Sequence, residues 1–146
     1  FLRAMGVSEE EIDAGIHDRG GLQGISGISG DLRYIEKAIA EGNARAQLAV
    51  DTFVDGMVRY IGGFYVEMEG VDTLVFTGGI GENSDLVRRL VCHKLDVLGV
   101  KLDIAANRKA RGDADLTLKG SRVRVLVIPT DEEKGIANET YLFKRT

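Results

Sequence analysis

Residues 78–83, Gly-Gly-Ile-Gly-Glu-Asn, are the segment whose types and spacing point most directly to chemistry. They follow a short β-favouring run, residues 72–77, so the expected structure is a strand entering a glycine turn. Glycines leave the backbone bare, and the free N–H groups at a helix start attract anions, so a phosphate or a nucleotide can come close here. The same glycines could serve only to turn the chain. The P-loop pattern is excluded because no Gly-Lys-Ser or Gly-Lys-Thr follows, and Ser84 stands where the dinucleotide pattern needs its last glycine.

A second candidate segment, residues 26–33, reads Ser-Gly-Ile-Ser-Gly-Asp-Leu-Arg. It delivers the Asp31 carboxylate and the Arg33 guanidinium at the head of an expected helix. Arg33 could stack on a base or pair with an anion. The alternative interpretation is that Asp31 only caps the helix and that Arg33 is a surface charge.

A third segment, residues 129–133, places three carboxylates after an apolar run at residues 123–128. That run predicts a strand buried on both faces, and open α/β sheets bind ligands at the carboxyl ends of such strands. The carboxylates could hold Mg²⁺, directly or through water, beside substrate phosphates. Acids in a first helical turn are also favoured by the helix dipole alone. Thr130 and Glu133 have the spacing of a capping box, which leaves Glu132 as the better metal ligand.

The elements of the first half are mostly helical. The capping-box spacing of Ser8 and Glu11 predicts a short helix toward His17, and the glycine-rich residues 20–30 predict a loop or irregular strand. A helix should then run from Asp31 until Gly42. Asn43 is the expected cap of the longest helix, whose apolar residues recur from Ala46 to Met68 at steps of three and four. This helix should bury one face over about seven turns and be central to the core.

In the second half, strand, glycine turn and helix follow each other. The helix after the residues 78–83 turn should be capped by Asn83 or Ser84, with the charges of Arg88, Arg89 and Lys94 facing away from the core. A last helix should start from Thr130. Strands that lead into helices in this way predict an α/β or α+β layered fold rather than a helical bundle.

Composition excludes several classes of protein. At 146 residues with a formal charge of -4, the chain should form one soluble domain and has no basic field for nucleic acid or anionic lipid. Its apolar runs are shorter than the ~20 residues that cross a bilayer. The single cysteine, Cys92, cannot form an internal disulfide, which suits a reducing, cytoplasmic compartment. The opening residues from Phe1 to Gly6 read as the tail of a helix, so we expect the chain to be an excised piece of a longer one.

Together, the three segments resemble those of acetate kinases in order and spacing. The similarity covers nearly the whole chain, and residues 76–83, Phe-Thr-Gly-Gly-Ile-Gly-Glu-Asn, are its most specific part. The family belongs to the superfamily of acetate and sugar kinases, heat-shock chaperones and actin, whose members have two similar α/β halves that close over ATP. The resemblance implies an actin-like ATPase (ribonuclease H-like) fold. It also implies that residues 1–146 are a single C-terminal nucleotide-binding domain, the second half of a two-domain acetate kinase.

The resemblance also assigns site residues. It implies that two segments contact ATP: Asp31, Leu32 and Arg33, and then Gly79, Ile80, Gly81, Glu82 and Asn83. It assigns the metal, Mg²⁺, to Glu132. Leu32 replaces the family's usual phenylalanine, and Asp131 replaces the usual asparagine and adds a charge near the metal. The family's acyl pocket and its residues at the transferring phosphoryl lie upstream, so we expect no catalytic residue in this chain.

The function implied by the resemblance is reversible transfer of the γ-phosphoryl of ATP to acetate, giving acetyl phosphate and ADP. The chain alone should be inactive. The expected partners are ATP or ADP, acetate or propionate through the upstream half, and a second copy in a homodimer, without nucleic acid or membrane. Two alternatives stay open, a propionate kinase and a non-catalytic dimerisation module. A sugar kinase or a chaperone ATPase shares the fold but fits these segments less well.

Overall fold

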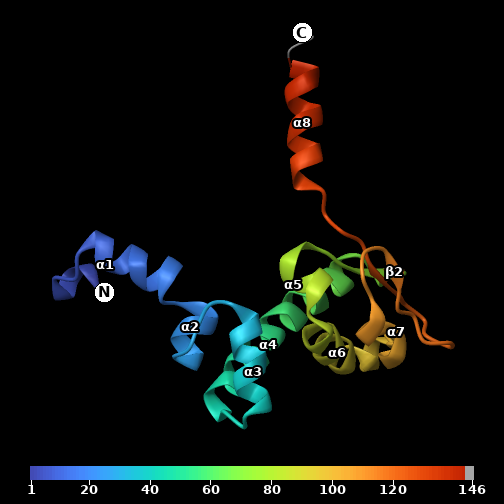
Figure 1. Ribbon diagram of the computed structural model, residues 1–146, viewed down its shortest axis with the longest axis horizontal. Coiled ribbons are helices and arrows are strands. Elements are labelled where there is room, and N and C mark those ends of the chain that lie inside the picture. The colour runs from blue at the N-terminus through green and yellow to red at the C-terminus, as the bar shows by residue number, and fades with distance from the viewer. Residues whose placement is uncertain (144–146) are drawn as a thin grey trace. The chain divides into compact units, whose positions relative to one another are not determined.

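The computed structural model describes residues 1–143, apart from the side chains of Glu132, Asn138 and Glu139. Contacts along the chain divide it into two compact units, residues 1–69 and the residues from 70 onward. The first unit is helical throughout and the second combines helices with a small sheet (Figure 1). Among the described residues, none of the helices combines the length and the apolar character that crossing a bilayer requires.

The first unit consists of four α-helices and two short helical turns among its described residues. They are η1 (Arg3–Met5), α1 (Glu9–Asp13), η2 (Ala14–Asp18), α2 (Gly21–Ser26), α3 (Leu32–Ala40) and α4 (Ala44–Glu67). The caps predicted for α1, α3 and α4 are confirmed. Ser8 and Glu11 form a capping box, Asp31 accepts a hydrogen bond from Arg33 N, and Asn43 accepts one from Ala46 N.

Helix α2 corrects the prediction of a loop at residues 20–30. Its glycines disfavour a helix, but α2 packs against α4, and Arg45 of α4 donates from Nε to Ile25 O at 3.0 Å and from Nη2 to Gly24 O at 3.4 Å. The helix ends where Gly27 adopts a left-handed φ of 70°. A contact from a distant residue therefore stabilises a helix that local propensity argues against.

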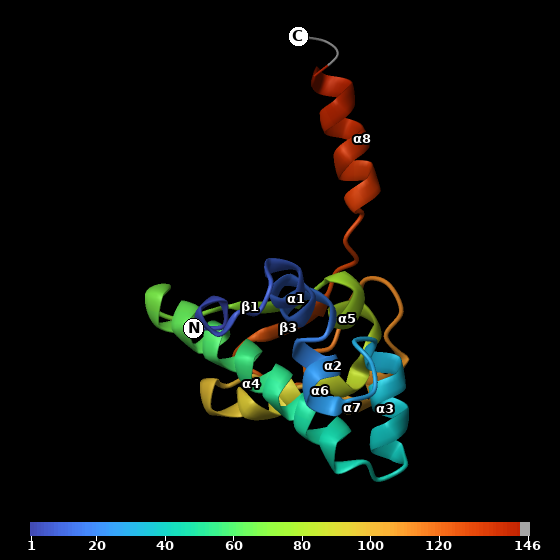
Figure 2. The same cartoon turned by 90° about the vertical axis from the view of Figure 1, so that its left-hand side faces the viewer.

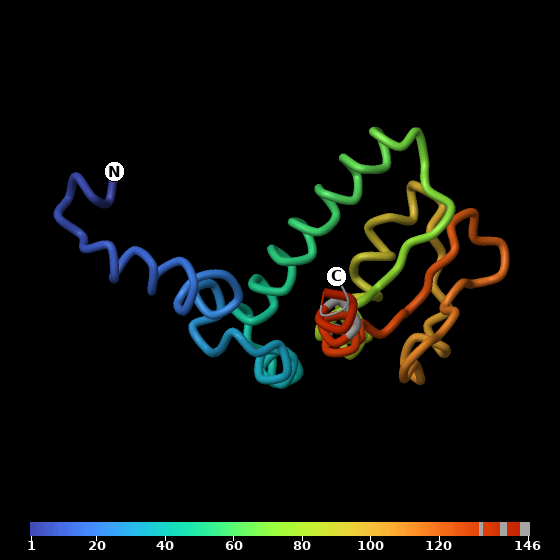
Figure 3. Tube along the Cα trace, turned by 90° about the horizontal axis from the view of Figure 1, so that it is seen from above, coloured from blue at the N-terminus to red at the C-terminus, as the bar shows by residue number. Residues whose placement is uncertain are grey.

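Helix α4 is continuous, as Figure 3 shows, but only its first half is core. The buried residues of this helix are Ala46, Ala49, Val50 and Val54. The prediction of one buried face along the whole helix is wrong for Phe64 and Met68, which are 56% and 60% exposed. Helices α2 and α3 pack on α4, and Arg45, which bonds to α2, lies in the first turn of α4.

The second unit holds the sheet. Its elements are β1 (Thr73–Phe76), α5 (Gly78–Asn83), α6 (Asp85–Lys94), η3 (Asp96–Leu98), α7 (Ile104–Lys109), β2 (Ala114–Asp115), β3 (Arg124–Val127) and α8 (Glu132–Phe143). The strand order is β1-β3-β2, with β1 parallel and β2 antiparallel to β3. Figure 2 shows β1 and β3 side by side.

The sheet has one covered face. Val125 and Val127 of β3 are fully buried, as is Phe76 beside Val127, whereas Val75 and Ile128 on the alternate side are 43% and 44% exposed. The prediction that the β3 strand is buried on both faces is therefore wrong. Successive side chains of a strand point to opposite faces, and the described residues cover only one of them.

Helix α5 corrects a second prediction. The glycine segment at residues 78–83 is not an open turn but a six-residue helix, and the cap of the next helix is Ser84 rather than Asn83. Ser84 accepts a hydrogen bond from Val87 N at 3.1 Å, so α6 begins directly after α5 ends.

Candidate functional site

The register of β1 and β3 brings two of the three candidate segments together. Phe76 pairs with Val127, and Ile128 N donates to Phe76 O at 3.0 Å. Because the strands are parallel, residues 77–83 and 128–133 leave the sheet at the same edge. This is the carboxyl edge where the sequence places a ligand site.

Two hydrogen bonds join these segments across the edge. Thr130 N donates to Glu82 Oε1 at 2.9 Å, and the hydroxyls of Thr77 and Thr130 are hydrogen bonded to each other. The sequence analysis missed Thr77 as a site residue and interpreted Thr130 only as a cap. The local sequence holds no signal for this pair, because it forms only through the register of two strands about fifty residues apart.

A polar hollow of about 390 Å³ lies between the joined segments. It is lined by Gly78, Gly79, Glu82, Thr130, Asp131 and Glu133. Gly79 is exposed and Gly78 is half-buried, so the bare backbone of this part of α5 is accessible to a ligand. Accessible backbone, one of the requirements for anion binding, is therefore present at this segment.

Gly81 has a different role, although it belongs to the same segment. It is buried, and a Cβ built on it would lie 3.3 Å from the carbonyl carbon of Phe76. This glycine allows α5 to lie close to the end of β1. Gly78 has a φ of +70°, a conformation that favours glycine at the start of α5. The two interpretations of the glycines therefore apply to different residues, because Gly78 and Gly81 shape the backbone and Gly79 leaves it open.

The side chains of Glu82 and Asn83 are both engaged within the site. The Glu82 carboxylate accepts from Thr130 N, and Asn83 Nδ2 donates to Gly79 O at 2.9 Å. Ile80 is half-buried. Direct contact of these three residues with ATP stays a prediction.

The acidic segment begins α8 in a way that differs from the predicted capping box. Asp131, rather than Thr130, accepts the hydrogen bond from Lys134 N, at 3.0 Å. The Thr130 hydroxyl bonds to Thr77 instead, and the helix starts at Glu132, one residue later than that box would place it. The predicted metal ligand Glu132 is the first residue of α8, and its side chain lies outside the described residues.

The carboxylates around the hollow suit Mg²⁺ that is held partly by phosphate oxygens and water, rather than a metal ion held by protein ligands alone. Among the described side chains, no three His, Cys, Asp or Glu residues are grouped to hold a metal. Magnesium at phosphate sites is bound by one or two carboxylates together with phosphate oxygens and water. Asp131 and Glu133 line the hollow, so carboxylates adjoin the space where phosphates would lie. The donor set therefore fits Mg²⁺ that arrives with a nucleotide.

Asp31, Leu32 and Arg33 belong to the first compact unit. Asp31 caps α3, and its carboxylate pairs with the Arg33 guanidinium at 2.5 Å, which lowers the pKa of Asp31. The Arg33 side chain is 87% exposed, whereas Leu32 is buried in the core. The capping interpretation of Asp31 is therefore correct, and a role of the three residues in ATP binding stays a prediction.

Comparison with known proteins gives the family. The sequence model of the Acetokinase family matches residues 1–138. The chain belongs to this family. It is 45% identical to an acetate kinase of Heliobacterium modesticaldum over 97% of its own length and 35% of the relative's length, and 44% identical to one of Moorella thermoacetica over 96% and 35%. The chain thus spans about a third of the curated relatives that it matches.

Solved structures of the family share the fold. The crystal structure of Porphyromonas gingivalis acetate kinase matches with a TM-score of 0.86 and 40% identity over 97% of this chain and 36% of that one. A propionate kinase from Francisella tularensis matches with a TM-score of 0.80 and 32% identity over 90% and 33%. The predicted α/β, actin-like ATPase fold is confirmed.

Arg88 lies in the core, contrary to the prediction. It was expected to face away from the core with Arg89 and Lys94, which are indeed exposed, but Arg88 is only 1% exposed. Its guanidinium donates to the carbonyl oxygens of Gly81 and Glu82, both at 2.8 Å. Burial lowers the pKa of Arg88.

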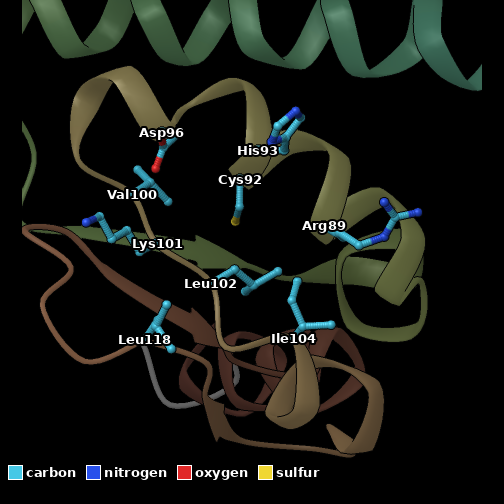
Figure 4. Close-up of a pocket in the computed structure, with 9 residues that line it drawn as sticks. All are labelled: Arg89, Cys92, His93, Asp96, Val100, Lys101, Leu102, Ile104 and Leu118. Atoms are coloured by element: carbon cyan, nitrogen blue, oxygen red, sulfur yellow. The ribbon is translucent and has the colours of Figure 1, made fainter.

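A larger cavity of about 450 Å³ lies beside α6, away from the predicted site residues (Figure 4). Its lining is mainly apolar and includes Cys92, Val100 and Leu102. Cys92 is 2% exposed, and burial raises the pKa of its thiol to about 12. The thiol therefore stays protonated near neutral pH and packs among the residues beside α6.

Proposed function

We propose that the complete protein containing this chain transfers the γ-phosphoryl of ATP to acetate, giving acetyl phosphate and ADP, and catalyses the reverse reaction. The relatives named acetate kinase support this proposal, at up to 47% identity. In this proposal, residues 1–146 are the C-terminal nucleotide-binding domain, and the acyl site belongs to the rest of the protein. The protein would work as a cytoplasmic homodimer.

The single observation that carries the proposal is the hollow at the sheet edge. There Gly79, whose backbone is exposed, lines the same hollow as Asp131 and Glu133. Phosphoryl transfer needs little covalent chemistry from the protein and depends on positioning and on neutralising charge. A site that places bare backbone beside carboxylates able to hold a metal meets both needs.

The residues of the chain would divide this work. The amides near Gly79 would receive the ATP phosphates, and the Glu82 carboxylate would keep α5 joined to Thr130. Mg²⁺ held near Glu132, with Asp131 beside it, would neutralise charge on the phosphates when bound. Asp31, Leu32 and Arg33 are proposed to complete the ATP contacts.

Propionate is the second candidate acceptor, because one of the matching solved structures is a propionate kinase. The two acceptors differ by one methylene, which an apolar pocket distinguishes by only ~1–3 kcal/mol. The preference for acetate or propionate is therefore set by the acyl pocket of the complete protein.

Assaying the complete protein tests the proposal. Purified protein is given ATP, Mg²⁺ and either acetate or propionate, and the acyl phosphate is trapped as its hydroxamate. We expect turnover with acetate at a higher kcat/KM than with propionate, and the opposite order would make the protein a propionate kinase. Absence of ATP-dependent acyl phosphate with both acids would contradict the proposal.

A matched pair of variants tests the metal site. Glu132→Gln should lower kcat strongly and raise the Mg²⁺ concentration needed for half-maximal rate. Glu10→Gln removes an exposed carboxylate from the first turn of α1 and should leave the rate unchanged. If both variants have the same kcat and the same Mg²⁺ dependence, Glu132 is not a ligand of the metal.

A further inference from the structure

We propose that Arg88 is a positioning residue that fixes the carbonyl end of α5 and thereby orients the nucleotide-binding amides of that helix. This inference rests on the proposed function, because it gives α5 a ligand. It assigns a role to a side chain that lies on the core side of α5 and lines no part of the hollow.

The Arg88 guanidinium joins two helices. Nη1 donates to Gly81 O and to Glu82 O, both at 2.8 Å, at the carbonyl end of α5. On the α7 side, Nε donates to Asn107 Oδ1 at 2.7 Å and Nη2 donates to Asn107 O at 3.0 Å. One planar group therefore holds the end of α5 at a fixed distance from α7.

Asn107 makes this connection rigid. It is fully buried, its Nδ2 donates to Asp85 O at 2.9 Å, and its backbone N–H donates to Asp103 O at 2.9 Å. Asp103 in turn caps α7 by accepting from Ala105 N and Ala106 N. The guanidinium is thus anchored to a capped helix rather than to a mobile side chain.

Burying an arginine costs free energy unless its guanidinium is hydrogen bonded. A charge that leaves water must be hydrogen bonded, and an apolar side chain would fill the same volume without that cost. The guanidinium has five N–H donors in one plane, which lets it donate to two successive carbonyls and to both oxygens of Asn107 at once. Its positive charge also lies at the carbonyl end of a helix, where the partial charge is negative.

Helix α5 needs external support, because it has six residues and three of them are glycine. Glycine loses more backbone freedom on ordering than any other residue, so an unsupported α5 would fluctuate. Carbonyls point toward one end of a helix and N–H groups toward the other. Fixing Gly81 O and Glu82 O therefore fixes the direction of the amides near Gly79, which faces the hollow.

The test compares variants of the complete protein by two measurements. Affinity for ADP with Mg²⁺ is measured by calorimetry, and amide hydrogen exchange of the protein without nucleotide is measured over residues 78–84. We expect Arg88→Met to weaken binding by about tenfold or more and to speed exchange in that segment. Arg88→Lys should recover little of the loss, because one ammonium group cannot reach both carbonyls and Asn107.

Val91→Ala is the matched control, because Val91 is a fully buried residue of the same helix α6. It should lower the melting temperature yet leave ADP affinity within about twofold of wild type. If Arg88→Met fails to fold, Asn107→Ser weakens the same connection more mildly and should also weaken binding. The inference on Arg88 is overturned if the Arg88 and Asn107 variants bind ADP as tightly as wild type. It is also overturned if Val91→Ala loses as much ADP affinity as they do. Neither result affects the proposed function. A wild-type protein that binds no ADP overturns the proposed function as well.

Discussion

At the scale of single residues, Gly79 and Gly81 show how one glycine segment can carry two unrelated constraints. A Cβ on Gly79 would meet nothing within 4 Å, whereas one on Gly81 would press on the backbone of Phe76 at 3.3 Å. Packing therefore accounts for Gly81, whereas nothing in the packing requires a glycine at position 79, which we assign to the proposed nucleotide site.

The two alanine substitutions are expected to separate these constraints. Gly79→Ala should leave the free energy of unfolding unchanged or raise it by up to ~1 kcal/mol, because alanine favours a helix, yet its methyl group should weaken ADP binding. Gly81→Ala should lower the free energy of unfolding by about 1–3 kcal/mol through overpacking. Thermal unfolding and calorimetry check both. Normal ADP affinity of Gly79→Ala would show that ligands do not use this backbone.

Asp115 is expected to make stability depend on pH. Its carboxylate accepts hydrogen bonds from Thr117 and from Arg124, which lower its pKa from 3.8 to about 2. A carboxyl whose pKa is lowered by folding stabilises the protein above its unfolded pKa, and that contribution is lost as pH falls through the folded value. Asp115→Asn should therefore lower the melting temperature near neutral pH.

The difference between Asp115→Asn and wild type should shrink as pH falls from 3.8 to about 2. Melting curves followed by circular dichroism over this range measure it. A difference that stays constant with pH would mean that the Asp115 carboxylate gains nothing from Thr117 and Arg124.

At the scale of elements, Ser84 caps α6, the helix that carries Arg88 to the carbonyl end of α5. Ser84 is 5% exposed and accepts from Val87 N, so Ser84→Ala should cost about 1 kcal/mol of folding free energy. Ser8→Ala removes the cap of α1, a helix without buried residues, and should cost less. Chemical denaturation of both variants compares them. A larger loss of folding free energy in Ser8→Ala than in Ser84→Ala would contradict the greater importance of the α6 cap.

The sequence is informative about elements wherever the controlling interaction is local. The caps Ser8, Asp31 and Asn43 follow from side chains two or three residues away from the amides that they bind. Helices α2 and α5 could not be predicted, because their glycines disfavour a helix and arginines of other helices, Arg45 and Arg88, bond to their carbonyls. A residue pattern carries no signal for such a partner.

In the candidate site, too, some features follow from the local sequence and others depend on contacts between elements. Its glycines and carboxylates stand in recognisable runs, and the parallel strands place those runs at one edge as expected. The bond between Thr130 and Glu82 spans 48 residues and depends on strand register. The burial of Arg88 likewise depends on α7, because Asn107 of that helix accepts two of its hydrogen bonds.

At the scale of the whole molecule, the chain spans about 35% of the length of its relatives, and we expect the residues at the transferring phosphoryl to lie in the rest of the complete protein. Transfer requires groups from both halves to converge on the phosphates. We therefore expect this chain alone to form no acetyl phosphate in a coupled assay with ATP, Mg²⁺ and acetate. Turnover by the purified chain would show that its own residues suffice.

The most direct test of the central claim is amide hydrogen exchange of the complete protein with and without ADP and Mg²⁺. The claim is that the nucleotide phosphates lie between α5 and the start of α8. Exchange should slow in residues 78–83 and 128–133, while residues 92–102 beside the larger cavity stay unchanged. Unchanged exchange in both segments at saturating ADP, with protection elsewhere, would contradict the claim.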